Sequence, residues 1–187
     1  MKEFLASFGL LTDSEISDLE QYVRPKTLQK EAFFIQTGQI CREVAFVQSG
    51  ILRSFYHNSA GEEITYCFTF FGNFLSAYSS FLTQTGTAEN IQSLTEVSLL
   101  TIPHETILRL EHESPNWLRL LKTIAEQEYI RLEKRIFLLQ KESAETRYRD
   151  LITHEPDLVR HIPLGHLASY LGITQRHLSR LRKSVSI

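Results

Sequence analysis

Two arginines near the C-terminus, Arg176 and Arg180, are spaced four residues apart. On a helix this spacing places both guanidinium groups on one face. An arginine fork can donate two parallel hydrogen bonds, either to a phosphate or to the O6 and N7 atoms of a guanine. The two arginines therefore indicate contact with nucleic acid, both at the backbone and at base edges.

Positive charge without acidic neighbours is confined to this end of the chain. Residues 158–187 contain five of the 20 Lys and Arg residues and none of the 22 Asp and Glu residues, although the formal net charge of the chain is -2. A solvated helix face usually carries both positive and negative side chains, whereas a phosphate-binding module carries mostly positive ones. The interpretation that these cations only solvate a helix is therefore the weaker one.

The apolar residues around the arginines predict a helix-turn-helix. Residues 164–171 form a first helix, Gly172 permits the left-handed backbone that ends it, and Thr174 caps a second helix over about 175–183. A plain helical hairpin shares the apolar pattern but not the charge. Gln175 is expected to read adenine or hold a phosphate, and Arg182 and Lys183 to hold phosphate. The full set expected to contact DNA is Thr174, Gln175, Arg176, His177, Ser179, Arg180, Arg182 and Lys183.

The segment from about residue 24 to 102 has the pattern of short strands. Runs rich in β-branched and aromatic residues cover 32–36, 44–49, 51–57, 64–70, 91–94 and 98–102. Glycines separate them at intervals of 12, 11 and 11 residues, at Gly38, Gly50, Gly61 and Gly72. Strands with turn signals at such regular intervals predict an antiparallel barrel or sandwich. Residues 58–61 predict a hairpin turn, and residues 3–23 are expected to be helical with a capping sequence at Thr12.

A long helix is expected to start at Ser114 and Pro115 and to continue to about Lys141. At 27 residues it would span about 40 Å, more than a barrel beside it needs. Its apolar residues recur at intervals of 3, 4, 4, 3, 4 and 3, which is nearly a heptad seam and predicts pairing with a second copy of the chain. Packing on its own domain is the alternative. The seam residues are Leu118, Leu121, Ala125, Tyr129, Leu132, Ile136 and Leu139. A further helix is expected over about 144–153.

Composition excludes several other classes of protein. The hydrophobic content of 42% suffices for a packed core, and no run of 18 apolar residues could span a membrane. The N-terminus is too acidic for a signal peptide, so we expect a cytoplasmic protein with Cys41 and Cys67 as free core thiols. The expected roll holds one histidine, His57, and no arrangement of Ser, His, Asp or Cys indicates a nucleophile. We therefore expect no metal, no cofactor and no enzymatic activity.

In this order the elements resemble the Crp/Fnr superfamily of bacterial transcription regulators. The most specific stretches are Ile162-Pro163 followed by LGHLASYLGITQRHLSRLRK, and IQSLTEVSLLTIP over residues 91–103. The resemblance implies an α+β fold: a cyclic-nucleotide-binding-like antiparallel β-roll of jelly-roll type with an N-terminal helix (1–113), a dimerisation helix (114–142), and a helix-turn-helix DNA-binding domain (143–187). That last domain is expected to be winged-helix-like with its wing missing or truncated.

The resemblance also implies an effector pocket in the roll, where this sequence departs from the pattern that binds cyclic AMP. Members that bind it carry a Phe-Gly-Glu-Leu-type turn followed by an Arg-Ser pair, but here the turn is Phe71-Gly72-Asn73-Phe74-Leu75 and residues 85–89 contain no Arg. No Lys or Arg occurs between Arg53 and Arg109, so a buried phosphate would lack a cation. Cyclic AMP is therefore not expected to bind in the usual way. Aromatic residues over 68–81 form either core or a pocket for an apolar small molecule. The candidate effector pocket comprises Phe71, Gly72, Asn73, Phe74, Thr87 and Ala88.

Together these features predict a sequence-specific regulator that binds double-stranded DNA as a homodimer. Two recognition helices would enter successive major grooves about 34 Å apart and read an inverted repeat. RNA polymerase is a further expected partner, and the effector is unassigned. The alternative is a ligand-binding sensor that regulates a protein partner without touching DNA, which would favour a tail of mixed charge.

Overall fold

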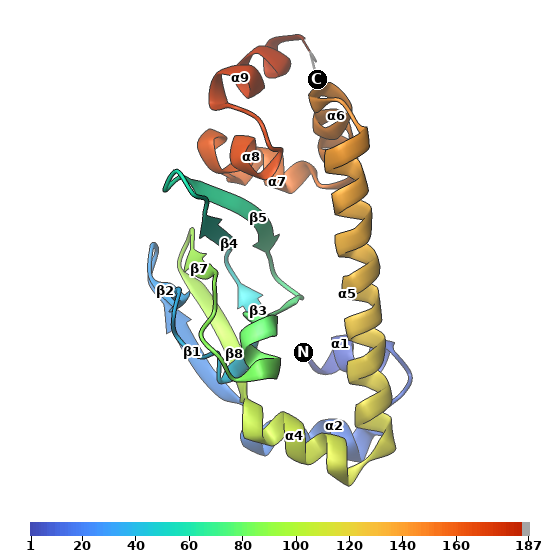
Figure 1. Ribbon diagram of the computed structural model, residues 1–187. Coiled ribbons are helices and arrows are strands. Elements are labelled where there is room, and N and C mark those ends of the chain that lie inside the picture. The colour runs from blue at the N-terminus through green and yellow to red at the C-terminus, as the bar shows by residue number, and fades with distance from the viewer. Residues whose placement is uncertain (185–187) are drawn as a thin grey trace. The chain divides into compact units, whose positions relative to one another are not determined.

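The computed structural model describes residues 1–184 (Figure 1). Residues 185–187, at the end of the expected DNA-binding domain, lie outside the described residues. The chain divides into two compact units: Met1–Tyr56 with Cys67–Ala125, and His57–Tyr66 with the chain from Glu126 onward. The sequence predicts the long helix as a separate segment, whereas the contacts of the folded chain divide it after Ala125.

Two four-stranded sheets with antiparallel pairings form the β-roll. The strand order is β1-β8-β3-β6 in one sheet and β2-β7-β4-β5 in the other. Buried Val47 and Leu99 of the first sheet join Leu52 and Ile91 of the second in one apolar core. The strands are β1 Arg24–Leu28, β2 Phe33–Ile35, β3 Glu43–Ser49, β4 Leu52–His57, β5 Glu63–Thr69, β6 Phe74–Leu75, β7 Asn90–Ser93 and β8 Val97–Pro103. This arrangement confirms the predicted α+β fold with an antiparallel roll.

Six of these strands coincide with the expected runs to within two residues at either end, and the hairpin turn is where the sequence places it. In that turn Asn58 accepts the amide of Gly61 at 3.0 Å, and Gly61 adopts a φ of +79°. The sequence pattern does not predict β1 and β6, nor helices α3 (Tyr78–Thr83) and α4 (His104–Glu113). Strand β1 is an edge strand in which only Leu28 is buried, so it shows no alternation, and β6 is two residues long. Helix α4 follows Pro103 without a side-chain cap.

The N-terminal helical region contains two short α-helices, α1 (Lys2–Ser7) and α2 (Asp13–Leu19), followed by a 3₁₀ turn over Glu20–Tyr22. The expected capping sequence forms a complete capping box between Thr12 and Glu15. The Glu15 carboxylate also accepts a hydrogen bond from the Ser114 hydroxyl and one from Asn116 Nδ2 at 3.2 Å. One carboxylate therefore ties the start of α2 to the start of the long helix α5 (Pro115–Lys141).

Helix α5 has the predicted bounds and length, and it is followed by four shorter helices (Figure 1). These are α6 Ala144–His154, α7 Pro156–His161, α8 Leu164–Tyr170 and α9 Gln175–Ser184, of which α7 was not predicted. Buried Tyr148, Leu151, Leu158, Leu167 and Leu178 form the apolar interior of these helices. Among residues 1–184, no helix combines the length and apolarity that crossing a bilayer requires.

The hydrogen bonds at Glu15 predict an acid-sensitive contribution to stability. They lower the pKa of Glu15 to about 2 from an ordinary value of 4.5, the bond from Ser114 being the largest cause. Because the folded pKa is depressed, the contribution is present above pH 4.5 and is lost as the pH falls toward about 2. Glu15 is only partly buried, so solvent screens its charge, and Glu15→Gln should cost about 1 kcal/mol at pH 7 and flatten the pH dependence in that window.

Urea unfolding between pH 2 and pH 7 measures this effect. Glu20→Gln is the matched control, since Glu20 forms a surface ion pair with Lys2 at 2.9 Å and its loss should cost less than about 0.5 kcal/mol. An equal pH dependence of the unfolding free energy in Glu15→Gln and the unsubstituted protein would contradict the assignment.

Candidate nucleic-acid interface

The turn between α8 and α9 has the geometry that the sequence predicts. Gly172 adopts a φ of +66°, and its amide and that of Ile173 donate to Ser169 O and Ala168 O, both at 3.0 Å. Thr174 caps α9 by accepting the amide of His177 at 3.2 Å. The left-handed glycine and the threonine cap together set the direction in which α9 leaves α8.

Helix α9 buries one face and exposes a cationic one. Leu178 and Leu181 are buried, as are Leu167 and Ala168 of α8, the helix against which α9 packs. With 3.6 residues per turn, Arg176, Ser179, Arg180 and Lys183 occupy the side of the helix opposite the two leucines. We call these four residues the reading stripe. The three cations of the stripe are exposed, Ser179 is half-buried, and α9 contains no acidic residue.

The other expected DNA-binding residues lie beside the stripe or behind it. Gln175 and His177 are exposed on its flanks, with Gln175 Oε1 close to Gly165 of α8. Arg182 points back into the protein: it is half-buried and its Nη2 donates to the carbonyl of Val159 at 3.1 Å. Arg182 therefore holds α9 against α7. The sequence could not show this role because α7 itself was not predicted.

The expected dimer seam is only partly covered within the single chain. Leu118, Tyr129, Leu132 and Ile136 are between 48% and 67% exposed, while Leu121, Ala125 and Leu139 are half-buried. All nine side chains from residue 126 to 134 are exposed. Ile130 and Phe137 form a second exposed apolar strip on another side of α5, and the Lys141 ammonium lies 4.8 Å from the centre of the Phe137 ring.

The residues expected to line an effector pocket have different surroundings in the structure. Phe71 is 71% exposed and Asn73 is exposed at the turn, whereas Phe74 stacks edge-on with Phe4 and Phe46. Thr87 is buried: its amide donates to Gln39 O and its carbonyl accepts from Gly38, both at 2.8 Å. Its hydroxyl also accepts the amide of Glu89 at 3.1 Å. Gly72 turns with a φ of +82°, and Ala88 is exposed.

A buried cation in the roll was not expected from the sequence. The Arg53 side chain on β4 is 1% exposed, and its guanidinium lies 3.9 Å from the centre of the Phe55 ring. Residues 52–55 are all buried, so both faces of this strand are covered and the burial pattern does not distinguish them. Simple alternation could therefore not assign Arg53 to the interior.

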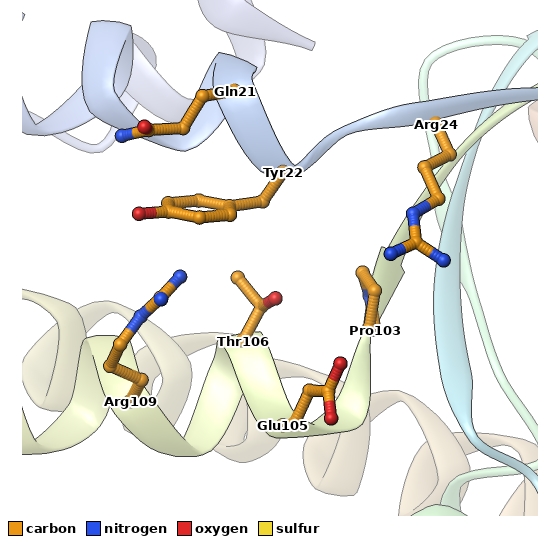
Figure 2. Close-up of a pocket in the computed structure, with 7 residues that line it drawn as sticks. All are labelled: Gln21, Tyr22, Arg24, Pro103, Glu105, Thr106 and Arg109. Atoms are coloured by element: carbon orange, nitrogen blue, oxygen red, sulfur yellow. The ribbon is translucent and has the colours of Figure 1, made fainter.

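Two adjoining cavities lie near the start of α4, and none of the expected effector residues lines either one. The first, of about 430 Å³, is lined by Gln21, Tyr22, Arg24, Pro103, Glu105, Thr106 and Arg109. Figure 2 shows the Arg109 guanidinium facing the Tyr22 ring, whose centre is 3.9 Å away. The second, of about 720 Å³, shares Arg24, Pro103 and Glu105 with the first. Both linings mix arginines with one or two carboxylates, so neither presents a field of one sign to a ligand.

Two comparisons concern the chain's sequence. Residues 25–114 match the model of the cyclic nucleotide-binding domain family. No curated protein gives a significant match.

Solved structures share the fold over most of the chain. FixK2 from Bradyrhizobium japonicum is 16% identical with a TM-score of 0.75, covering 87% of this chain and 84% of its own. A putative regulator of the Crp/Fnr family from Eubacterium rectale is 17% identical with a TM-score of 0.75, covering 97% and 87%. The c-di-GMP-responsive global regulator CLP of Xanthomonas campestris is 17% identical with a TM-score of 0.72, covering 93% and 91%. At these identities the likeness concerns the fold.

Proposed function

Since this chain carries a cyclic nucleotide-binding domain at residues 25–114 and has the fold of the Crp/Fnr transcription regulators, we propose that it is a DNA-binding transcription regulator acting as a homodimer. The observation that carries the proposal is the reading stripe, a row of exposed cations on a helix without acidic residues. Such a helix suits the major groove, where phosphates flank base edges that arginine recognises.

The residues of the reading stripe differ in the part of DNA that each can contact. Arg176 and Arg180 lie one turn apart and present two forks to base edges, and Lys183 lies one further turn along, where a point charge suits a phosphate. Gln175 and His177 flank the same surface, and Thr174 acts through the cap. Arg182 is occupied with Val159 and contributes by holding the helix in place.

The homodimer is supported by the apolar side chains that α5 exposes. Four seam residues are about half exposed or more in the single chain. Exposure of these apolar side chains to water costs free energy, and a second copy would remove that cost by covering them. Two copies related by a two-fold axis present two reading stripes, and a spacing of about 34 Å would match successive major grooves. Contact with RNA polymerase and action in the cytoplasm belong to the same proposal.

A regulator of a protein partner that never touches DNA is the competing function. It would need no row of cations free of acidic neighbours, and α9 supplies one. The charge of α9 therefore favours DNA.

Selection of binding sites from random duplex DNA tests the proposed function. We expect a two-fold symmetric site, and Arg180→Ala should weaken binding to it by about 1–3 kcal/mol while relaxing the base preference at one position of each half-site. Arg160→Ala is the control, because Arg160 is exposed on α7 outside the stripe. Absence of duplex binding at low salt would refute the function, and equal loss on every sequence would reassign Arg180 to phosphate contact.

Analytical ultracentrifugation of two neighbouring substitutions tests the dimer seam. Ile136→Glu places a charge within the seam and should raise the dimer dissociation constant at least about 100-fold. Phe137→Glu alters a similarly exposed residue on another side of α5 and should leave the dimer intact. If Ile136→Glu stays dimeric, or if Phe137→Glu alone dissociates the protein, the interface is not the predicted seam.

Titration calorimetry with cyclic AMP and cyclic GMP tests the effector expectation. Residues 54–108 contain no Lys or Arg, and the amide, carbonyl and hydroxyl of Thr87 are all engaged within the protein. A cyclic phosphate bound at this loop would lose its strong hydrogen bonds to water. No Lys or Arg nearby in the sequence could form new hydrogen bonds in their place. We expect no micromolar binding, and heat of binding in that range would overturn the expectation.

A further inference from the structure

Ser169 of α8 forms two hydrogen bonds with the backbone of β5. The amide of Thr65 donates to Ser169 Oγ at 2.9 Å, and the Ser169 hydroxyl donates to the carbonyl of Glu63 at 3.1 Å. An amide and a carbonyl two residues apart on one edge are the groups that a neighbouring strand would bond. Since β5 is the last strand of its sheet, one hydroxyl bonds two backbone groups on its outer edge.

The next residue, Tyr170, is held from α5. Arg135 Nη2 donates to the carbonyl of Tyr170 at 2.7 Å, and the Arg135 guanidinium lies 3.7 Å from the centre of the Tyr170 ring. Tyr170 ends α8, where carbonyls lack partners within the helix and a cation is favourable. The arginine fork and the ring face fix the direction as well as the distance of this contact.

These contacts all lie within the second compact unit and leave the reading stripe uncovered. Residues 63–66 of β5, α5 from Glu126, and α8 with α9 belong to that unit. Helix α9 is packed on α8 through buried leucines, so an orientation fixed at Ser169 and Tyr170 is passed on to the stripe. The turn is supported as well, because a Cβ on Gly172 would lie 3.6 Å from Leu139 of α5.

We propose that Ser169 and Arg135 are positioning residues for DNA reading, which hold the last turn of α8 between the edge of β5 and helix α5. We call the contacts of Ser169 and Arg135 the α8 clamp. Arg135 directly precedes Ile136 of the seam, so the clamp fixes the stripe relative to the surface through which two copies would pair. The inference rests on the proposed function. If the two reading stripes of a dimer are already held at one separation, binding to both half-sites does not cost the entropy of fixing their orientation.

The first test uses Ser169→Ala, with Ser7→Ala as the matched control that removes one hydroxyl bond inside a single helix. We expect Ser169→Ala to bind a complete two-half-site duplex about threefold to tenfold more weakly. Its affinity for a single half-site should be unchanged, and it should tolerate altered half-site spacing better than the unsubstituted protein. A merely structural role would weaken both duplexes alike, and equal affinity for the complete site would overturn the proposal.

Hydrogen exchange separates failure of the clamp from failure of DNA binding. In the absence of DNA, the Thr65 amide should be protected in the unsubstituted protein and should exchange at least about threefold faster in Ser169→Ala. Unchanged Thr65 exchange would refute the clamp even if DNA binds. Absence of duplex binding together with faster Thr65 exchange would instead refute its role in DNA reading and the proposed function, while the contact itself would stand.

A second substitution tests whether the two sides of the clamp act together. Arg135→Lys keeps the charge but loses the planar fork and the stacking on Tyr170. We expect it to lose affinity for the complete site as Ser169→Ala does, and the double variant to bind about as weakly as the weaker single variant. Losses that simply multiply would show two independent contacts and overturn the single clamp.

Discussion

The packing of α8 against α9 is the constraint on which the candidate interface depends. Leu167 and Leu178 are completely buried, and Ala168 is small enough to let the two helices approach closely. Leucines occupy the inner face of α9. The charged side chains on the opposite face of the helix must therefore point to solvent, because burying an unpaired cation costs free energy. The reading stripe is thus a consequence of the apolar pattern, and its chemistry comes from the residue types that evolution placed at the remaining positions.

Helix α5 carries both the seam and the contacts that support α8, the helix on which the reading stripe is packed. Side chains of its middle section are exposed on every side, and the apolar ones among them favour a partner helix. The next residue, Arg135, contacts the end of α8, and one turn further along Leu139 lies beside Gly172. A shift of α5 that altered the seam would therefore also alter contacts of α8, which is the physical requirement for coupling between pairing and DNA reading.

Thr87 lies in the loop where the family resemblance places a cyclic phosphate, and its polar groups bond within the roll. Thr87 uses its backbone groups to join loop 84–88 to loop 36–39, and its hydroxyl is also engaged. The buried cation of the roll is instead Arg53, which lies on β4 opposite Gln92 and stacks on Phe55. An effector that used Arg53 would have to enter a strand whose residues 52–55 are already covered on both faces.

The sequence by itself determined the elements with a clear local signal: six strands rich in β-branched and aromatic residues between turn signals, the bounds of α5, and the helix-turn-helix with Gly172 and Thr174. It failed where an element is short or has one covered residue, as in β1, β6 and α7, because the local pattern then carries no period. Only the tertiary structure decided what Arg182, Arg53, Ser169 and Arg135 contact. Each of these side chains meets a partner on another element or is covered by one. Such contacts depend on how separate elements pack, which the spacing of residues along one element does not specify.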